Sequence, residues 1–161
     1  MIRSAVSIRP VLLSVERAAL LRLHALSRRL NRAPKLPPHL QTGVRGEFEA
    51  LFYLRRLGYT VVERRWRSPE LNGDLDLIAW EADTLCFVEV KTRTARDMTP
   101  AALAIDGPKR TMLQKMANSY IRSLPRDSGG SDILARFDIV SVYLLGDQIE
   151  CELVRNAFPR R

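Results

Sequence analysis

The sequence has few of the residues on which several common kinds of active site depend. Its 161 residues include only two histidines, His24 and His39, and both lie in an N-terminal segment outside the region that we expect to be globular. Without a histidine in that region, Ser-His-Asp and Cys-His catalysis are excluded. Two cysteines are too few for an ordinary structural zinc site. The sequence also has no glycine-rich phosphate loop of the Walker or dinucleotide-binding type.

Long apolar runs are absent as well. No run approaches the ~20 residues that a membrane-spanning helix needs, so we expect no membrane partner. Cys86 and Cys151 both fall in predicted strands, where cysteine usually behaves as a small buried apolar residue, so we predict free thiols and a reducing, cytoplasmic location. The chemistry that remains for an enzyme uses carboxylates and lysine, which favours hard oxygen ligands and Mg²⁺ or Mn²⁺.

Positive charge is concentrated near the N-terminus. The net charge of +8 is typical of proteins that bind nucleic acid or another polyanion. Residues 1–40 hold eight Lys and Arg against Glu16 alone, whereas residues 41–161 hold eighteen Lys and Arg against seventeen Asp and Glu. Prolines at 34, 37 and 38 end a predicted helix over 14–32. We therefore predict a basic helical extension with a Pro-rich linker over 1–40 and a globular domain over 41–161.

The extension has three interpretations. It is a helix attached to the body with its charged side in solvent, a basic arm that grips phosphates, or an Arg-rich, acid-poor targeting peptide. We favour the first, because charge runs are more often solvated faces than binding sites.

The periodicity of the domain predicts the order helix, three strands, helix, two strands. The expected elements are a helix over 42–57, a strand over 59–63 that continues to Arg67, a hairpin over 73–93, a helix from Pro108 to Leu124, and a hairpin formed by 136–145 and 148–154. This order indicates an α/β domain with a mixed sheet and helices packed against it.

The hairpin over 73–93 carries charges inside its apolar strands. A turn centred on Ala82 and Asp83 pairs Trp80 with Leu85, and the same register places Asp76 opposite Glu89 and Asp74 opposite Lys91. Like charges directly opposite each other are destabilising unless something compensates them. A divalent cation between the carboxylates is one interpretation. The other is a solvated face on which Asp74 and Lys91 form a weak ion pair.

Two other charged groups have alternative roles. Glu47 is either a first-turn carboxylate that the helix dipole favours or a part of the site. The segment Arg64-Arg65-Trp66-Arg67 either holds phosphate and stacks a base or protects a strand edge with charge.

Several motifs together resemble the YraN-like family of small bacterial proteins. They are Gly43-Val-Arg-Gly46-Glu47, Leu57-Gly58-Tyr59, Gly73-Asp-Leu-Asp76-Leu-Ile-Ala, Phe87-Val-Glu89-Val-Lys91-Thr-Arg93, Pro108-Lys109-Arg110, Arg136-Phe137-Asp138 and Asn156-Ala157-Phe158. The resemblance covers residues 43–158. That family is similar to archaeal Holliday-junction resolvases and resembles the PD-(D/E)XK, or restriction-endonuclease-like, nuclease superfamily.

The resemblance implies an α-β-β-β-α-β core and a metal-dependent nuclease that hydrolyses phosphodiester bonds, with DNA favoured over RNA and branched DNA among its substrates. Asp76, Glu89 and Glu47 match the superfamily's metal-binding carboxylates, and Lys91 completes its Glu-x-Lys pair. The implied cofactor is Mg²⁺ or Mn²⁺. Candidate phosphate contacts are Arg64, Arg67, Arg93 and Lys109. The alternative is a nuclease-fold module that binds nucleic acid or another protein without turnover. Whether the protein forms a homodimer is not decided by the sequence.

Some positions depart from the family pattern or have no assigned role. Asp74 stands where the family mostly has Glu, Arg65 where it often has Asn, and Thr99 where it usually has Gly. Arg136 and Asp138 match motif positions, but the sequence assigns them no chemical step.

Overall fold

The structure is a computed structural model that describes residues 37–96, 105–125 and 133–160, with the isolated positions Val15, Ala18, Ala19 and Arg22. Contacts divide the chain into two compact units, Met1–Gln41 and Thr42–Arg161. Most of the helix predicted over 14–32, and Thr99, lie outside the described residues. The fold below is that of the described residues from Pro37 onwards.

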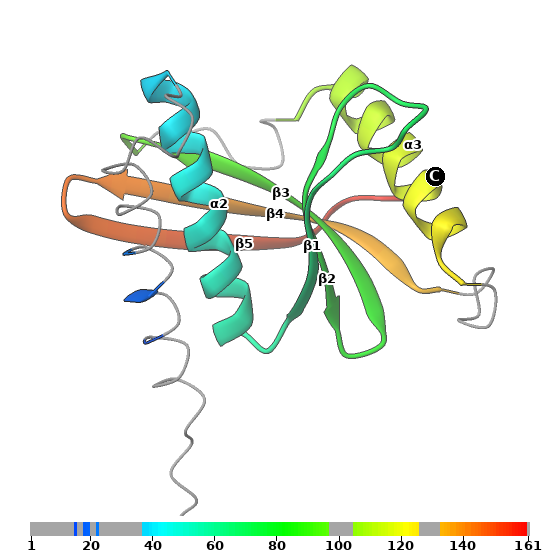
Figure 1. Cartoon of the computed structure of the whole chain (residues 1–161), viewed down its shortest axis with the longest axis horizontal. Helices are drawn as coiled ribbons and strands as arrows, with labels where there is room; N and C mark the ends of the chain where they lie inside the picture. The colour runs from blue at the N-terminus through cyan, green and yellow to red at the C-terminus, as the bar shows by residue number, and fades with distance from the viewer. Residues whose placement is uncertain are drawn as a thin grey trace, which may run out of the picture. The chain divides into compact units, whose positions relative to one another are not determined.

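The elements follow the predicted order (Figure 1). They are α2 (Pro38–Arg56), β1 (Thr60–Trp66), β2 (Leu75–Glu81), β3 (Thr84–Arg93), α3 (Gly107–Ser123), β4 (Ala135–Leu145) and β5 (Gln148–Phe158). The strands form one sheet in the order β1-β2-β3-β4-β5. β3 and β4 are parallel, and the other neighbours are antiparallel. The prediction of an α/β fold with a mixed central sheet is confirmed.

The first helix begins earlier than the sequence predicted. The carbonyl of Pro37 accepts hydrogen bonds from the backbone N–H groups of Leu40 and Gln41, each at 3.0 Å. Pro38 fits the first helical position because the N–H that it lacks would have no partner there. The predicted start at Thr42 is therefore wrong by four residues, because Pro38 begins the helix and does not belong to the linker. The helix ends before Gly58, whose φ is +93°.

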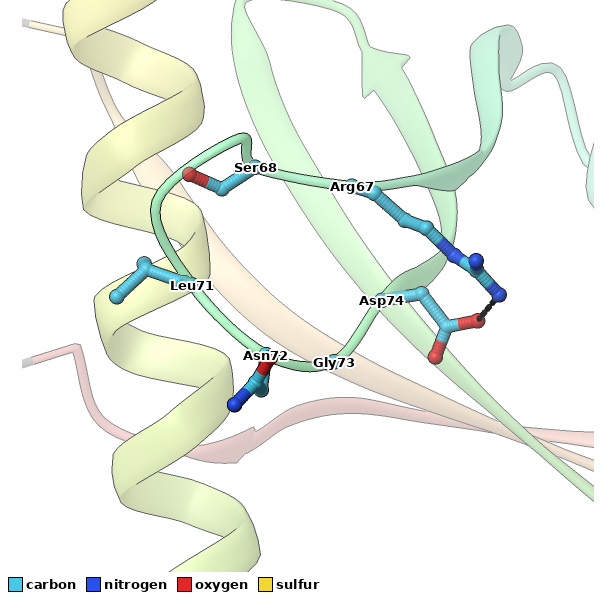
Figure 2. A pocket seen from close by; sticks show the side chains of 6 residues that line it. All are labelled: Arg67, Ser68, Leu71, Asn72, Gly73 and Asp74. Atoms are coloured by element: carbon cyan, nitrogen blue, oxygen red, sulfur yellow. Dashed lines mark ion pairs between the residues drawn. The ribbon is translucent and has the colours of Figure 1, made fainter.

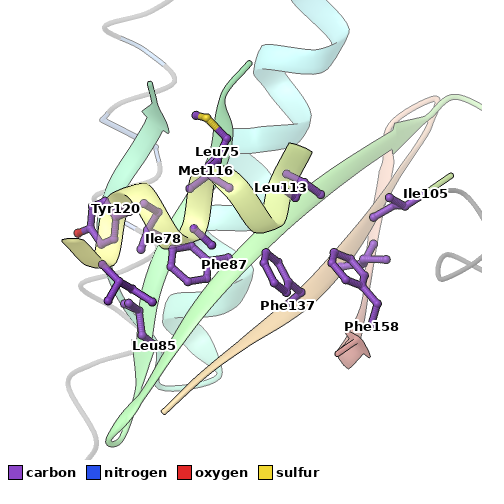
Figure 3. Close-up of a cluster of buried hydrophobic side chains, with 13 residues drawn as sticks. Leu75, Ile78, Leu85, Phe87, Ile105, Leu113, Met116, Tyr120, Phe137 and Phe158 are labelled. Atoms are coloured by element: carbon purple, nitrogen blue, oxygen red, sulfur yellow. The ribbon is translucent and has the colours of Figure 1, made fainter. Parts of the chain in front are cut away.

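Apolar side chains cover both faces of the sheet. Leu51 and Leu54 of α2 pack over Leu77 and Val88 on one face. On the other face α3 covers a cluster that Figure 3 shows, in which Met116 and Tyr120 lie over the strands. Its aromatic rings are in direct contact, with centroids of Phe137 and Phe158 4.5 Å apart in a stacked arrangement. The central strands are thus covered on both sides, so a carboxylate within them lowers the stability of the fold unless it is paired.

The predicted free thiols are confirmed, because Cys86 and Cys151 form no disulfide. Within the part of the chain that the structure describes, no helix is both long enough and apolar enough to cross a membrane.

Candidate metal and phosphate site

Strands β2 and β3 pair near their turn and then separate. Trp80 pairs with Leu85 as predicted, and the last pair of this ladder is Leu77 with Val88. Beyond it β3 continues to Arg93 against β4. The loop that joins β1 and β2 curves towards α3, whereas β3 runs on past α2 (Figure 1). We call the place where β2 and β3 part, beyond Leu77 and Val88, the strand fork.

The fork forms because the β1–β2 loop is attached to α3. The hydroxyl oxygens of Ser68 and Ser119 lie 3.1 Å apart at hydrogen-bonding distance. Gly73 has a φ of +119°, and a Cβ at this position would lie 2.7 Å from the sulfur of Met112. These contacts join residues far apart in sequence, so the turn-based register could not predict them. The expected direct pairing of Asp76 with Glu89 is therefore corrected, since both lie beyond the last paired residues.

Asp76 lies at the start of the fork. Its Oδ2 accepts a hydrogen bond of 2.8 Å from the backbone N–H of Val90, so the side chain takes the place of a missing ladder acceptor. Burial raises the pKa of Asp76 to about 7, and the neighbouring Glu89 carboxylate adds to the effect, against the Val90 hydrogen bond. The carboxylate is therefore held where its charged form is disfavoured.

Glu89 projects from β3 on the α3 side of the sheet and is only 6% exposed. Its Oε1 lies 3.0 Å from Nζ of Lys91 and 3.3 Å from Nζ of Lys109, which is in the first turn of α3. Its Oε2 is buried and has no hydrogen-bond partner. A buried carboxylate oxygen without a partner carries a desolvation cost, so a ligand at this atom would be stabilised.

Lys91 and Asp74 do not form the predicted cross-strand pair. Lys91 is paired with Glu89, and Asp74 is 3.8 Å from Nη2 of Arg67. On β4, Ser141 pairs in register with Lys91, and its buried Oγ also lacks a hydrogen-bond partner. Ser141 could not be found from the sequence, because its position beside Lys91 depends on the parallel pairing of β3 with β4.

Glu47 approaches the strand fork from α2, and its carboxylate forms ion pairs with arginine side chains. Nε and Nη2 of Arg65 each lie 2.7 Å from one of its carboxylate oxygens. Nη2 of Arg64 lies 3.9 Å away, and the Arg64 guanidinium lies 4.0 Å from the ring centroid of Phe48. Glu47 contributes to the raised pKa of Asp76. Its predicted role as a metal ligand stays a prediction, because Arg65 occupies both of its oxygens.

The predicted phosphate contacts come from different elements of the fold. Arg64 and Arg67 belong to the β1 side, Arg93 ends β3, and Lys109 stands at the start of α3. Arg67 is highly exposed, with 74% of its side chain accessible. Trp66 in the same segment is partly buried, and its ring meets Tyr120 edge-on at 5.2 Å. Trp66 therefore contributes to the core.

The carboxylate oxygens at the fork fit a hard divalent cation whose remaining ligands are water or substrate oxygens. Among the described residues, no three His, Cys, Asp or Glu side chains group closely enough to hold a metal ion by themselves. Mg²⁺ is usually bound by one or two carboxylates, with water and substrate phosphates as its other ligands. Asp76 and Glu89 interact electrostatically, and Glu89 has an unpartnered oxygen. These two carboxylates are the residues that would hold such an ion.

A second buried acid, Asp138, has a different environment that the sequence did not reveal. Nε of Arg136 donates to both of its oxygens, at 2.9 and 3.2 Å, and the backbone N–H of Asn156 donates at 2.9 Å. The hydroxyl of Tyr59 lies 3.4 Å from it. Asn156 has a φ of +50° at an irregularity in β5 that brings its N–H to the carboxylate. The motif Arg136-Phe137-Asp138 thus builds a hydrogen-bonded network within the sheet.

Comparison with known proteins agrees with the motifs. Residues 46–142 match the model of a family described as "Uncharacterised protein family UPF0102". The chain is 44% identical over 125 residues to a UPF0102 protein of Koribacter versatilis, covering 78% of this chain and 84% of the relative. It is 42% identical over 113 residues to one of Solibacter usitatus, covering 70% and 82%, and 39% identical over 121 residues to one of Rhodococcus jostii, covering 74% and 98%. The chain belongs to the UPF0102, or YraN-like, family.

Proposed function

We propose that this protein is a divalent-metal-dependent nuclease that hydrolyses phosphodiester bonds in DNA and acts in the cytoplasm. The observation that carries the proposal is the pair of carboxylates at the strand fork, the partly buried Asp76 and the buried Glu89. One carboxylate has its pKa raised to about 7, and the other has a buried oxygen without a partner. Such perturbed, unsatisfied groups are characteristic of functional sites.

The residues around the fork have complementary tasks. Asp76 and Glu89 would hold Mg²⁺ or Mn²⁺, which when bound polarises a phosphodiester oxygen and lowers the pKa of a water molecule. Lys91, whose Nζ is 3.0 Å from Glu89, would position the attacking water and offset the negative charge that develops on the phosphate. Nζ of Lys109 lies 3.3 Å from the same oxygen of Glu89, and Lys109 would contact a neighbouring phosphate.

The basic residues on the β1 side and at the end of β3 would position the nucleic acid. Arg64 lies in β1 and Arg93 at the end of β3, whereas Arg67 is paired with Asp74. Contacts from Arg64 and Arg93 to phosphates would orient a substrate without selecting a sequence. Because the region from 41 to 161 has nearly balanced charge, with eighteen Lys and Arg against seventeen Asp and Glu, we expect moderate affinity that falls as salt rises.

The test is cleavage by the purified protein and by Asp76→Asn, Glu89→Gln and Lys91→Ala. Single-stranded, duplex, flap and four-way-junction DNA would be offered with Mn²⁺, and a matched set of RNA substrates would check the preference for DNA. We expect each variant to lose cleavage while it keeps its circular dichroism spectrum. Lys115→Ala, on the exposed side of α3, is the matched control and should cleave normally. Equal cleavage by all three site variants would overturn the proposal.

A second candidate is a module that binds nucleic acid or protein without turnover. One observation favours it: Glu47 and Glu89 are both neutralised by cations of the chain itself, Arg65 in one case and Lys91 with Lys109 in the other. Calorimetry with Mn²⁺ separates the candidates. Binding that disappears in Asp76→Asn supports the nuclease, and the absence of Asp76-dependent binding supports the module.

A further inference from the structure

The loop between β1 and β2 forms a small open pocket beside the candidate metal site. Its cavity volume is about 350 Å³, and it is lined by Arg67, Ser68, Leu71, Asn72, Gly73 and Asp74 (Figure 2). This volume is within the range of ~300–1,000 Å³ that is usual for small-ligand sites. Asp74 precedes Asp76 by two residues, so a chemical group bound in the pocket would lie next to the fork.

The pocket has a defined shape because α3 supports the loop. Ser68 contacts Ser119 of α3 at 3.1 Å and also accepts a hydrogen bond of 3.3 Å from the backbone N–H of Glu70. Leu71 packs against the α3 cluster, and Gly73 lies against Met112. A loop that is held in place before binding loses less conformational entropy when a ligand arrives.

The charges of the pocket select against a phosphate. Arg67 and Asp74 reach towards each other on one side of the loop, 3.8 Å apart (Figure 2). They are the charged residues among the six that line the pocket, so the lining charges sum to zero. A phosphate attracted by Arg67 would be repelled by Asp74. A neutral group with both hydrogen-bond donors and acceptors matches this pair, and the amide of Asn72 adds one more donor and acceptor.

We propose that this pocket binds one unpaired nucleobase next to the phosphodiester bond that would be cleaved at the site of Asp76 and Glu89. The proposal rests on the nuclease function proposed above and narrows its substrate to nucleic acid with unpaired bases. Asp74 would accept from an amino or imino group of the base, and Arg67 would donate to its oxygen or ring nitrogen. The Watson–Crick edge of every base offers such groups, but a continuous duplex already uses them in pairing. The pocket is thus suited to gapped, bulged, branched or single-stranded sites.

The experiment measures binding to three fluorescent DNA duplexes by anisotropy, with Ca²⁺ and again with a chelator. One duplex is continuous, one carries a single unpaired cytidine, and one carries an abasic residue in place of that cytidine. We expect the protein to bind the cytidine duplex about tenfold more tightly than the abasic one, as one set of contacts to a base edge would give. Asp74→Asn and Asn72→Ala should remove most of this difference. Asn72→Ala keeps the charge of the pocket and should leave binding to the continuous duplex unchanged.

Arg67→Gln tests the pocket, and Arg122→Gln, which removes the same charge elsewhere, is its control. Arg67→Gln should reduce the difference between the cytidine and abasic duplexes, whereas Arg122→Gln, in the last turn of α3, should affect all three duplexes equally. Wild-type protein that binds the cytidine and abasic duplexes alike would overturn the proposal, and so would pocket variants that weaken all three equally.

The two proposals fail separately. Normal cleavage by Asp76→Asn, together with a base-dependent difference that the pocket variants abolish, removes the nuclease function and keeps the base pocket. Loss of cleavage in Asp76→Asn without any base-dependent binding removes the pocket and keeps the nuclease.

Discussion

Asp138 and Asp76 are both carboxylates within strands of one sheet, but their surroundings are opposite. Asp138 is fully buried and accepts hydrogen bonds from the Arg136 guanidinium and from the backbone N–H of Asn156. Asp76 accepts a hydrogen bond from the backbone N–H of Val90 and has a second carboxylate, that of Glu89, as its electrostatic neighbour. The first acid is satisfied by the protein, and the second is left in need of a cation. This difference separates a carboxylate that stabilises the fold from the one for which we propose a role in metal binding.

The network around Asp138 extends beyond the strand. Nη2 of Arg136 donates to the Tyr59 hydroxyl at 2.9 Å and also contacts Glu81. Nη2 of Arg155 lies 2.9 Å from the other oxygen of Glu81. Burial, with the Asp138 charge adding to it, raises the pKa of Tyr59 to about 12, so its hydroxyl stays a neutral member of the network. Each charge here has a partner, in contrast to the unpartnered Oε2 of Glu89.

The largest effect that we expect comes from Asp138→Ala. Removing this carboxylate leaves the partly buried Arg136 guanidinium without its main partner, which should lower the free energy of unfolding by about 3 kcal/mol. Urea unfolding followed by circular dichroism measures the loss. Asp147→Ala, in the exposed β4–β5 turn, is the control and should change stability by less than about 0.5 kcal/mol. An equally small change for both variants would mean that the network does not stabilise the sheet.

Asp76→Asn should act in the opposite direction. A carboxyl whose pKa is raised on folding costs stability as it ionises, so the cost begins above its unfolded pKa of roughly 4 and is complete above about pH 7. Removing this charge should therefore stabilise the metal-free protein by about 2 kcal/mol at pH 8, and by much less near pH 4. Unfolding in the presence of a chelator at the two pH values measures it. Destabilisation of equal size at both would contradict the assigned environment of Asp76.

The contact between α2 and β3 determines how close Glu47 comes to the fork. A Cβ at Gly46 would lie 1.8 Å from Oγ1 of Thr92, so Gly46→Ala should push the helix away and cost about 1–3 kcal/mol. Gly43 lies in the same helix with nothing within 4 Å of such a Cβ. Gly43→Ala should therefore raise stability by about 0.5–1 kcal/mol. Thermal unfolding compares the two, and similar changes in both would show that the close approach is not required.

Arg65→Asn should have the smallest effect on stability and tests whether Glu47 belongs to the metal site. Arg65 has a φ of +49°, which Asn tolerates well, but Asn is too short to hold both oxygens of Glu47. Because the pair is partly exposed, we expect a loss below about 1 kcal/mol. Mn²⁺ affinity measured by calorimetry should rise if the released Glu47 joins Asp76 and Glu89. Arg65→Lys, which keeps the charge without the bidentate geometry, should lie between wild type and Asn. Unchanged Mn²⁺ affinity in Arg65→Asn would remove Glu47 from the site.

The comparison also shows which parts of the molecule the sequence could predict. The pairing of Trp80 with Leu85 followed from a local turn and the alternation of apolar residues, and the structure confirms it. The separation of the strands at Asp76 did not follow, because it depends on contacts of Ser68 and Gly73 with α3. Local signals therefore predicted the order of the elements and the register next to the turn, and non-local packing determined the geometry of the site.

The partners of the charged motif residues also lie far from them in the sequence. Arg136 and Asp138 could be recognised as motif positions, but their partners Tyr59 and Asn156 lie at distant places in the chain. The same holds for Arg65, whose pairing with Glu47 depends on the placement of α2 beside β1. A single sequence identifies such charges but does not show which of them neutralise one another.

The hydrogen bond from Val90 to Asp76 makes a backbone amide a reporter for the carboxylate. At 2.8 Å, the Val90 N–H senses the electron density on Oδ2, and protonation of Asp76 or capture of a cation withdraws that density. The amide proton of Val90 should therefore shift in an NMR titration with Mg²⁺ or with pH, while the Phe87 amide earlier in the same strand stays nearly constant. One resonance would follow the occupancy of the site without a substrate, a cleavage assay or an added label.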